Sequence, residues 1–213
     1  MAEQLPITNM FPHEEFDEWA ESYDASVSTD QFPFYGYQQV LAHVVTLAEA
    51  TPGMSVLDLG SGTGNLATGF ARKGCELWCT DFSAPMLEQA RQKLPDAHFL
   101  LHDLSMEFPA EWQRPFDRIV SAYVFHHFEL DEKVRILRGL LPRLAPGGRM
   151  VLADIAFPDQ AALDKVKAGA GQGWEDEFYW LVDESLPTLE EAWLRVSYRQ
   201  VSVCAGVFVL FPI

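Results

Sequence analysis

Residues 56–66 read Val-Leu-Asp-Leu-Gly-Ser-Gly-Thr-Gly-Asn-Leu, which is an apolar strand pattern followed by three alternate glycines and the start of a helix. One acid, Asp58, stands two residues before the first glycine. Glycine lets the backbone turn tightly and approach a ligand where a Cβ atom would collide, and the first turn of a helix offers unpaired N–H groups. The stretch therefore predicts a ligand-binding loop between a strand and a helix.

A phosphate-binding dinucleotide loop, as in an NAD-linked oxidoreductase, is the main alternative for this stretch. Its third glycine falls three residues after the second, but Asn65 occupies that position here and Gly64 comes one residue early. The Asp58 carboxylate also suits a cationic, zwitterionic or hydroxyl-bearing group better than a pyrophosphate. We therefore favour an adenosine cofactor that carries such groups, and keep the oxidoreductase as the alternative.

The pattern Asp-x-Gly-x-Gly-x-Gly after a strand resembles motif I of the class I S-adenosylmethionine-dependent methyltransferases. Two later stretches resemble further landmarks of this family, in the same order. Residues 115–128 enter a strand through Phe-Asp and leave it through His-His-Phe, like motif IV, and residues 144–148 (Leu-Ala-Pro-Gly-Gly) resemble the element after it. The resemblance, to small cytosolic bacterial members with small-molecule substrates, implies a Rossmann-like fold, S-adenosylmethionine as cofactor and S-adenosylhomocysteine as product.

Strand and helix patterns alternate between about residues 55 and 155, which predicts an α/β fold with a doubly wound, mostly parallel sheet. Two apolar runs at residues 195–205 and 207–211, joined near Gly206, suit the antiparallel hairpin that ends the seven-stranded sheet of the family. We expect a single domain over residues 1–213. Its expected parts are a helical lid (1–50), a cofactor-binding core (51–155), a helical aromatic insertion that caps the acceptor pocket (156–195) and the C-terminal strands (196–213).

The resemblance also implies roles for residues at successive strand ends. Asp81 ends a strand about twenty residues after the glycine loop and is the expected acceptor for the ribose hydroxyls. The other expected cofactor contacts are Asp58, Gly60, Ser61, Gly62, Gly64 and Tyr23 at the methionine and ribose side, Phe82 and Met86 beside the adenine, Asp103 and Leu104 at its amino group, and Ser121 on the pocket floor. Singly, Asp81 and Asp103 also fit solvated loop acids, but acids in register at successive strand ends favour a site.

His126 and His127 follow the fourth strand pattern at the ligand-binding edge, where an imidazole can act as a general base near neutral pH. A base is needed only if the acceptor arrives protonated. Because a His-His-Phe turn recurs in small methyltransferases with different acceptors, the alternative role for one histidine is to hydrogen-bond the loop backbone. Tyr23, in an aromatic N-terminal segment, is the expected lid residue, with helix packing as the alternative. We expect no metal, because adjacent histidines do not readily converge on one ion and no cysteine or acid lies at ligand spacing.

The composition limits the class of partner. The 213 residues carry 15 basic and 31 acidic side chains, a formal net charge of −16, which disfavours nucleic acid and anionic membranes. The sequence has no signal-peptide pattern, no apolar run of membrane-spanning length and 3 cysteines, so we expect a cytoplasmic enzyme with reduced thiols. We therefore predict methyl transfer to a small-molecule acceptor. A non-catalytic S-adenosylmethionine-binding protein stays open, as does the choice between monomer and homodimer.

Overall fold

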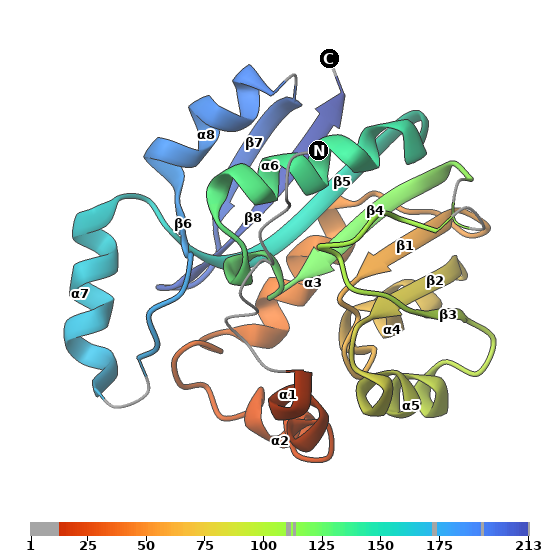
Figure 1. Ribbon diagram of the computed structural model, residues 1–213, viewed down its shortest axis with the longest axis horizontal. Helices are drawn as coiled ribbons and strands as arrows, with labels where there is room; N and C mark the ends of the chain where they lie inside the picture. The colour runs from red at the N-terminus through yellow and green to blue at the C-terminus, as the bar shows by residue number, and fades with distance from the viewer. Residues whose placement is uncertain (1–12, 110–111, 113, 172–173, 193, 213) are drawn as a thin grey trace, which may run out of the picture.

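The described part of the chain is built on one mixed sheet of eight strands, which crosses the centre of Figure 1. A computed structural model describes residues 13–109, 112, 114–171, 174–192 and 194–212. Within these residues the strands are β1 (Ser55–Leu59), β2 (Glu76–Asp81), β3 (His98–Leu101), β4 (Phe116–Ala122), β5 (Leu144–Phe157), β6 (Trp180–Leu181), β7 (Leu194–Gln200) and β8 (Ala205–Pro212). Every residue of β1 is buried, as expected for a central strand covered on both faces.

The strand order confirms the predicted doubly wound sheet. Seven strands follow the path β3-β2-β1-β4-β5-β8-β7, and the short β6 pairs beside this path with β5. Neighbours from β3 to β5 are parallel, whereas β8 is antiparallel to both β5 and β7. The chain reverses its direction of winding between β1 and β4. In open α/β sheets, ligands bind beyond the carboxyl ends of the strands at such a switch point.

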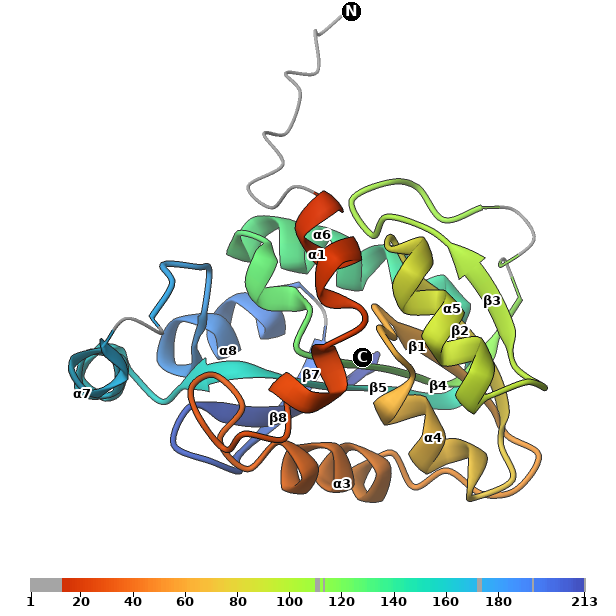
Figure 2. The same ribbon diagram turned by 90° about the horizontal axis from the view of Figure 1, so that it is seen from below.

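Helices cover both faces of the sheet. In chain order they are α1 (His13–Trp19), α2 (Tyr23–Ser26), α3 (Tyr37–Leu47), α4 (Asn65–Ala71), α5 (Ala84–Lys93), α6 (Leu130–Leu140), α7 (Gln160–Ala170) and α8 (Val182–Glu191), with the 3-10 turns η2 (Phe125–His127) and η3 (Leu141–Arg143). Figure 2 shows α3 and α4 on one side of the sheet and α6 and α8 on the other, while α7 stands at the periphery. None of the helices in the described residues has the length and apolar composition needed to cross a membrane.

The segment predicted as a lid, residues 1–50, contains two different kinds of helix. α1 packs against α5 near the carboxyl edge of the sheet, whereas α3 packs on α4, β5 and β8 and belongs to the layer that covers the sheet. α3 buries Tyr37, Val40, Leu41 and Val44, a spacing of three and four that forms one apolar stripe. Residues 1–12 of the predicted lid lie outside the described part, as do 172, 173 and 193 of the predicted cap. Of the described helices before β1, α1 and α2 carry residues that line the pocket described below, whereas α3 does not.

The C-terminal hairpin forms as predicted, but its connection, expected near Gly206, lies at residues 201–204. β7 ends at Gln200 and β8 begins at Ala205, so Gly206 lies inside the hairpin, where it pairs with Gln200. A Cβ atom at this position would collide with the ring of Tyr198. The glycine therefore marks a close approach of an aromatic side chain to a strand, which is a second common reason for glycine in a sheet.

Candidate functional site

One large pocket opens at the carboxyl ends of the parallel strands. Its volume is about 1200 Å³, and its wall includes residues at or after the ends of β1, β2, β3 and β4, namely Gly60, Asp81, His102 and Tyr123. Residues of α1, α2 and the segment 175–179 complete the wall. A site for a single small ligand occupies about 300–1,000 Å³, so this pocket has room for a cofactor and a second ligand.

The loop after β1 shapes one end of the pocket. Gly60 has a φ of 62°, and a Cβ atom there would collide with the side chain of Val124, which follows β4. Both the backbone conformation and the packing therefore require glycine. The Gly62 N–H donates to Oδ2 of Asp81 over 2.8 Å, so this hydrogen bond ties the loop to the end of β2.

Asp81 is held by two backbone donors. Besides Gly62, the Ser83 N–H donates to Oδ1 of Asp81 over 2.9 Å. Burial raises the pKa of Asp81 to about 6, although the N–H groups of Ser83 and Gly62 oppose this shift. A carboxylate offers about four lone-pair positions. Because Asp81 also lines the pocket, it can accept further hydrogen bonds from the hydroxyl groups of a ligand.

Asp58 is fully buried behind the loop. Among the described residues, neither of its carboxylate oxygens has a hydrogen-bond partner of ordinary geometry. Burial, followed by the nearby charge of Asp81, raises the pKa of Asp58 well above its usual range, and the backbone N–H of Ala67 opposes this. A buried carboxylate without a good partner costs free energy. A cationic or amino group of a ligand at the loop would reduce that cost.

The residues expected around the adenine share one part of the wall, formed by Phe82, Met86, Asp103 and Leu104. The Ser83 hydroxyl accepts a hydrogen bond from the Met86 N–H over 3.3 Å and so caps α5. The Phe16 ring of α1 packs edge-on against the Phe82 ring, with 5.0 Å between the centroids. These contacts make an apolar slot with an acid beside it, which suits a flat ring that carries an amino group.

The N-terminal helices are fastened to the glycine loop by the carboxylate of Asp24. It accepts hydrogen bonds from Thr63 Oγ1 at 2.6 Å, Asn65 Nδ2 at 2.9 Å and Lys93 Nζ at 2.6 Å. Tyr23, the neighbour of Asp24, lines the pocket, and its ring lies 4.8 Å from that of Trp19. Burial raises the pKa of Tyr23 well above its usual range, so its hydroxyl stays protonated. Tyr23 thus both packs with the helix and faces the pocket.

Four residues expected at the cofactor are absent from the pocket wall: Asp58, Ser61, Gly64 and Ser121. Ser121 is fully buried, and its Oγ donates to the Leu59 carbonyl over 2.8 Å, which joins β4 to β1. Gly64 precedes α4 and packs closely on Leu94, 3.1 Å from the place where a Cβ atom would lie. Ser121 therefore supports the pocket from behind and does not form its floor.

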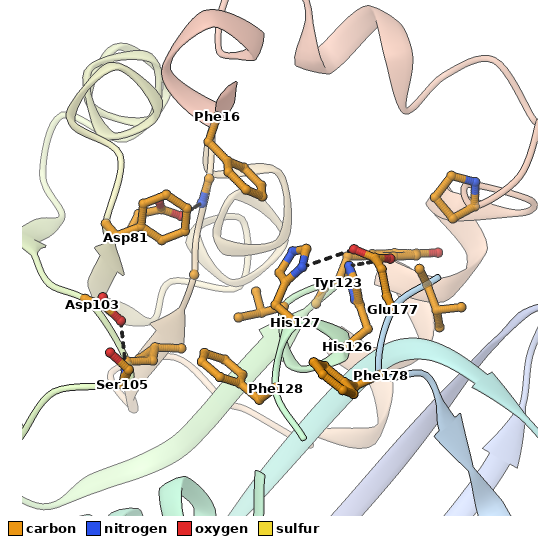
Figure 3. Close-up of a pocket in the computed structure, with 18 of the residues that line it drawn as sticks. Phe16, Asp81, Asp103, Ser105, Tyr123, His126, His127, Phe128, Glu177 and Phe178 are labelled. Carbon is orange, nitrogen blue, oxygen red and sulfur yellow. Dashed lines mark hydrogen bonds and ion pairs between the residues drawn. The ribbon is translucent and has the colours of Figure 1, made fainter. Parts of the chain in front are cut away.

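His126 and His127 lie on η2 at the other end of the pocket, and Figure 3 shows both rings beside Glu177. His126 Nδ1 lies 2.5 Å from Asp154 Oδ1. Because an ionised carboxylate only accepts hydrogen bonds, Nδ1 of His126 carries the proton. The second nitrogen of His126, Nε2, lies 3.8 Å from Glu177 Oε2, and His127 Nδ1 lies 3.2 Å from Glu177 Oε1. Glu177 therefore contacts both imidazoles.

Glu177 comes from the insertion between β5 and the C-terminal strands, far along the chain from the histidines. The next residue, Phe178, donates its N–H to the His126 carbonyl over 3.0 Å, and Lys133 Nζ of α6 donates to the Phe178 carbonyl. Lys133 is itself buried, with Nζ 4.3 Å from the centre of the Trp180 ring. Bonds to both sides of the Phe178 backbone therefore place Glu177 beside η2.

Burial and mutual contacts determine the protonation states of the two histidines and the two carboxylates. Burial lowers the pKa of His126, but the charge of Asp154 outweighs it and the pKa is raised overall. Burial, and then the charge of His126, lower the pKa of His127. Burial raises the pKa of Asp154 and of Glu177, but the histidine contacts outweigh it and both values are lowered. Both carboxylates are therefore ionised at neutral pH.

Glu177, Asp154 and Tyr123 are site residues that the sequence-based interpretation missed. An acid inside a strongly apolar strand was the available signal for Asp154, and an acid among the aromatic residues of the insertion was the signal for Glu177. Tyr123 lines the pocket with a φ of 59°, which is uncommon for a residue with a Cβ atom. Strained positions of this kind gather at functional sites.

The geometry also contradicts the reasons for expecting no metal site. One of them was that adjacent histidines do not converge, yet the ring centroids of His126 and His127 lie 4.1 Å apart on η2. One ligand atom each from His126, His127 and Glu177 lie within 4.8 Å of one another. The acid that completes the set comes from the insertion, which no sequence spacing reveals.

Comparisons with known proteins cover most of the chain. A family profile described as "Methyltransferase domain" matches residues 56–148. An uncharacterized methyltransferase of Geobacillus kaustophilus is 35% identical over 197 residues, which are 87% of this chain and 89% of that protein. Another, from Bacillus pumilus, is 34% identical over 201 residues, which are 88% of this chain and 91% of that protein.

Solved structures share the fold. A complex of DhpI with SAM and HEP superposes with a TM-score of 0.74 at 20% identity, over 93% of this chain and 95% of that one. A complex of DhpI with SAH gives a TM-score of 0.71 at 19% identity, over 94% of both chains. The sequence relatives are named methyltransferases, which favours this family over the dinucleotide alternative. The chain belongs to the methyltransferases.

Proposed function

We propose that this enzyme methylates a small-molecule acceptor that binds between the glycine loop and the His126–His127 turn. The observation that carries the proposal is the continuous pocket of about 1200 Å³, which joins Gly62 and Asp81 at one end to the two histidines at the other. Residues of α1, α2 and the segment 175–179 form part of the pocket wall. Concave sites of this kind bury most of a compact ligand, whereas a polymer would need an open groove.

The charge of the pocket wall supports a neutral or cationic acceptor. Acidic residues in the wall beyond the cofactor end are Glu15, Glu129, Asp131, Glu132, Glu175 and Glu177. Arg135, the one arginine among the described wall residues, is paired with Glu132 at 3.1 Å. Together with the formal net charge of −16, this wall repels polyanions such as nucleic acid.

For the cofactor we propose the roles that the geometry allows. Asp81 accepts hydrogen bonds from the ribose hydroxyls, and Asp58 compensates the positive charge at the methionine end. Gly60 and Gly62 let the loop backbone approach the cofactor closely, and Ser61 and Gly64 hold the loop in place. Phe82 and Met86 lie beside the adenine, and Asp103 with Leu104 lies at its amino group. When bound, S-adenosylmethionine supplies a methyl group already activated by the sulfonium charge.

At the acceptor end, we propose that the histidine pair receives the proton of an acceptor that arrives protonated. The His127 side chain is 18% exposed and that of His126 is 8% exposed, so His127 is the more accessible of the two. Glu177 orients His127, and Asp154 orients His126 through Nδ1. Tyr23 and the other aromatic wall residues exclude water around the methyl group and hold the acceptor in line, which accelerates a displacement without a covalent enzyme intermediate.

Binding calorimetry tests the cofactor half of this proposal. S-Adenosylmethionine and S-adenosylhomocysteine should bind the wild-type protein, with NAD(H) as the negative control. Asp81→Ala should weaken binding by about 1–3 kcal/mol, or about 5- to 150-fold, through lost hydrogen bonds to the ribose. Asp96→Ala, a change at an exposed acid outside the pocket wall, should leave the dissociation constant unchanged. Equal affinities for wild type and Asp81→Ala would contradict the proposed position of the ribose at Asp81.

A further inference from the structure

We propose that His126, His127 and Glu177 bind a divalent transition-metal ion at the acceptor end of the pocket. The three residues offer one ligand atom each within 4.8 Å of one another. Ligands of a tetrahedral ion with bonds of about 2.0–2.1 Å lie about 3.3–3.4 Å apart. His127 Nδ1 lies 3.2 Å from Glu177 Oε1, which is close to that value, and His126 Nε2 lies 3.8 Å from the other oxygen, Oε2, so the two imidazoles flank the same carboxylate.

The surroundings of His126 provide an independent argument. Its Nδ1 lies 2.5 Å from Asp154 Oδ1, which directs the lone pair of Nε2 toward Glu177. Asp154 is itself fixed by the Trp180 Nε1–H at 2.9 Å and the Ile155 N–H at 2.8 Å. A carboxylate bound to the second nitrogen of a histidine is the usual support of a metal-ligating imidazole, because it fixes both the tautomer and the ring orientation.

The charge around the three ligands also favours a dication. Glu177 and the buried Asp154 bring two carboxylates, whereas Lys133 is the neighbouring ammonium group and donates to the Phe178 carbonyl. With neutral imidazoles, the cluster of Glu177, Asp154 and Lys133 carries one net negative charge. A bound dication would therefore reduce the electrostatic repulsion between the carboxylates.

The donor set indicates the kind of ion and its role. Two imidazoles and one carboxylate suit zinc, cobalt, nickel, iron or manganese, whereas magnesium and calcium prefer oxygen ligands. All three residues line the pocket, so the remaining coordination positions face the space for the second ligand. An open position of this kind is typical of catalytic and not of structural zinc sites.

If the proposed function holds, the ion would hold the acceptor atom and lower the pKa of its proton. With the ion bound, the histidines act as its ligands and the acceptor's proton passes to solvent, whereas in the metal-free enzyme the histidine pair receives that proton. The acceptor's electron pair forms the new bond to the methyl carbon, and the electrons of the broken carbon–sulfur bond stay on sulfur. Only this role depends on methyl transfer, because the metal site itself rests on the three side chains.

The test is a titration of the tag-free, chelator-treated protein with Co²⁺, followed by visible absorption, with equilibrium dialysis against Zn²⁺ as the second measurement. The wild type should bind one equivalent and show the intense absorption of a four- or five-coordinate cobalt ion. Glu177→Gln should weaken binding at least about 100-fold, since it removes a first ligand. Asp154→Asn should weaken it by about 10- to 100-fold, the usual effect of losing an outer partner.

Glu175→Gln is the matched control, because Glu175 is an exposed wall residue of the same segment and lies outside the ligand set. It should retain the wild-type stoichiometry and spectrum. No saturable cobalt absorption in the wild type, or equal binding by wild type and Glu177→Gln, would overturn the metal site. Calorimetry with S-adenosylmethionine on the same samples separates the two proposals, since loss of the metal site leaves cofactor binding intact.

Discussion

The Gly62 N–H donates to Oδ2 of Asp81 over 2.8 Å, and this hydrogen bond joins the glycine loop after β1 to the acid at the end of β2. The second oxygen of Asp81 is held by the Ser83 N–H at the start of α5. Loop, acid and helix are thus fixed relative to one another before a cofactor binds. Such preorganisation reduces the free energy that binding must spend on ordering the site.

The pH dependence of cofactor affinity should report Asp81. Burial raises its pKa to about 6, and only the carboxylate form accepts hydrogen bonds from both ribose hydroxyls. Affinity for S-adenosylmethionine should therefore be constant above pH 7 and fall about tenfold by pH 5, where Asp81 is ionised in about one protein molecule in ten. Calorimetry across this range measures the effect.

The charged groups that bear on Asp81 are Asp58 from β1 and Asp17 from α1, and Asp58, whose pKa is also raised by burial, can add to the pH dependence. Asp81→Asn separates them, because this variant should bind more weakly and lose the dependence between pH 5 and 7. A slope that survives in Asp81→Asn would assign the titration to another group.

Asp24→Ala should loosen the N-terminal helices over the pocket. The change removes acceptors for Thr63, Asn65 and Lys93 at once. The pair with Lys93 is partly exposed and contributes at most about 1 kcal/mol, so we expect S-adenosylhomocysteine to dissociate about 3- to 10-fold faster. Stopped-flow fluorescence of Trp19, which packs beside Tyr23, follows the release. Glu21→Ala, at a nearby exposed acid, is the control. If S-adenosylhomocysteine dissociates from Asp24→Ala as slowly as from the wild type, the N-terminal helices are not a lid.

His127→Ala should separate turnover from cofactor binding. With a true acceptor, kcat should fall about 10²- to 10⁴-fold, the range for loss of a group that handles a proton, whereas the dissociation constant of S-adenosylmethionine should stay within about twofold. His43→Ala on α3, a residue outside the pocket wall, is the control. Unchanged turnover of His127→Ala would remove this residue from the reaction.

Gly206→Ala should destabilise the hairpin, because the new Cβ atom would collide with the Tyr198 ring. Overpacking of this kind costs about 1–3 kcal/mol of unfolding free energy, measured by urea denaturation. In the Tyr198→Leu background the same substitution should cost less. Gly139→Ala is the matched control, since nothing lies within 4 Å of a Cβ atom there, and alanine in α6 should stabilise the protein by up to about 1 kcal/mol.

The parts of the site that were predictable from the sequence are those carried by short, contiguous signals. Strand and helix periodicity predicted the doubly wound sheet, and Asp81 was found because it ends the strand that follows the glycine loop. Phe82 and Met86 were expected from the family resemblance, beside a helix capped by Ser83, and both line the pocket. In each case the position depends on local geometry that a parallel sheet repeats.

The parts that were missed depend on contacts between distant segments. Glu177 reaches the histidines because the Phe178 N–H bonds to the His126 carbonyl, and no periodicity encodes that bond. Ser121 was expected on the pocket floor, but its hydroxyl bonds to Leu59 within the sheet. The direction of a side chain at a strand end depends on the partner strand as well as on the motif.

The most direct test of the central claim is the destination of the methyl group. The enzyme is incubated with S-adenosylmethionine carrying a tritium-labelled methyl group and with the small-molecule, protein and RNA fractions of a bacterial extract. Label should enter the small-molecule fraction that passes an ultrafiltration membrane, and Asp81→Ala should reduce this transfer while Asp96→Ala should not. Label confined to the RNA or protein fraction would contradict a small-molecule acceptor.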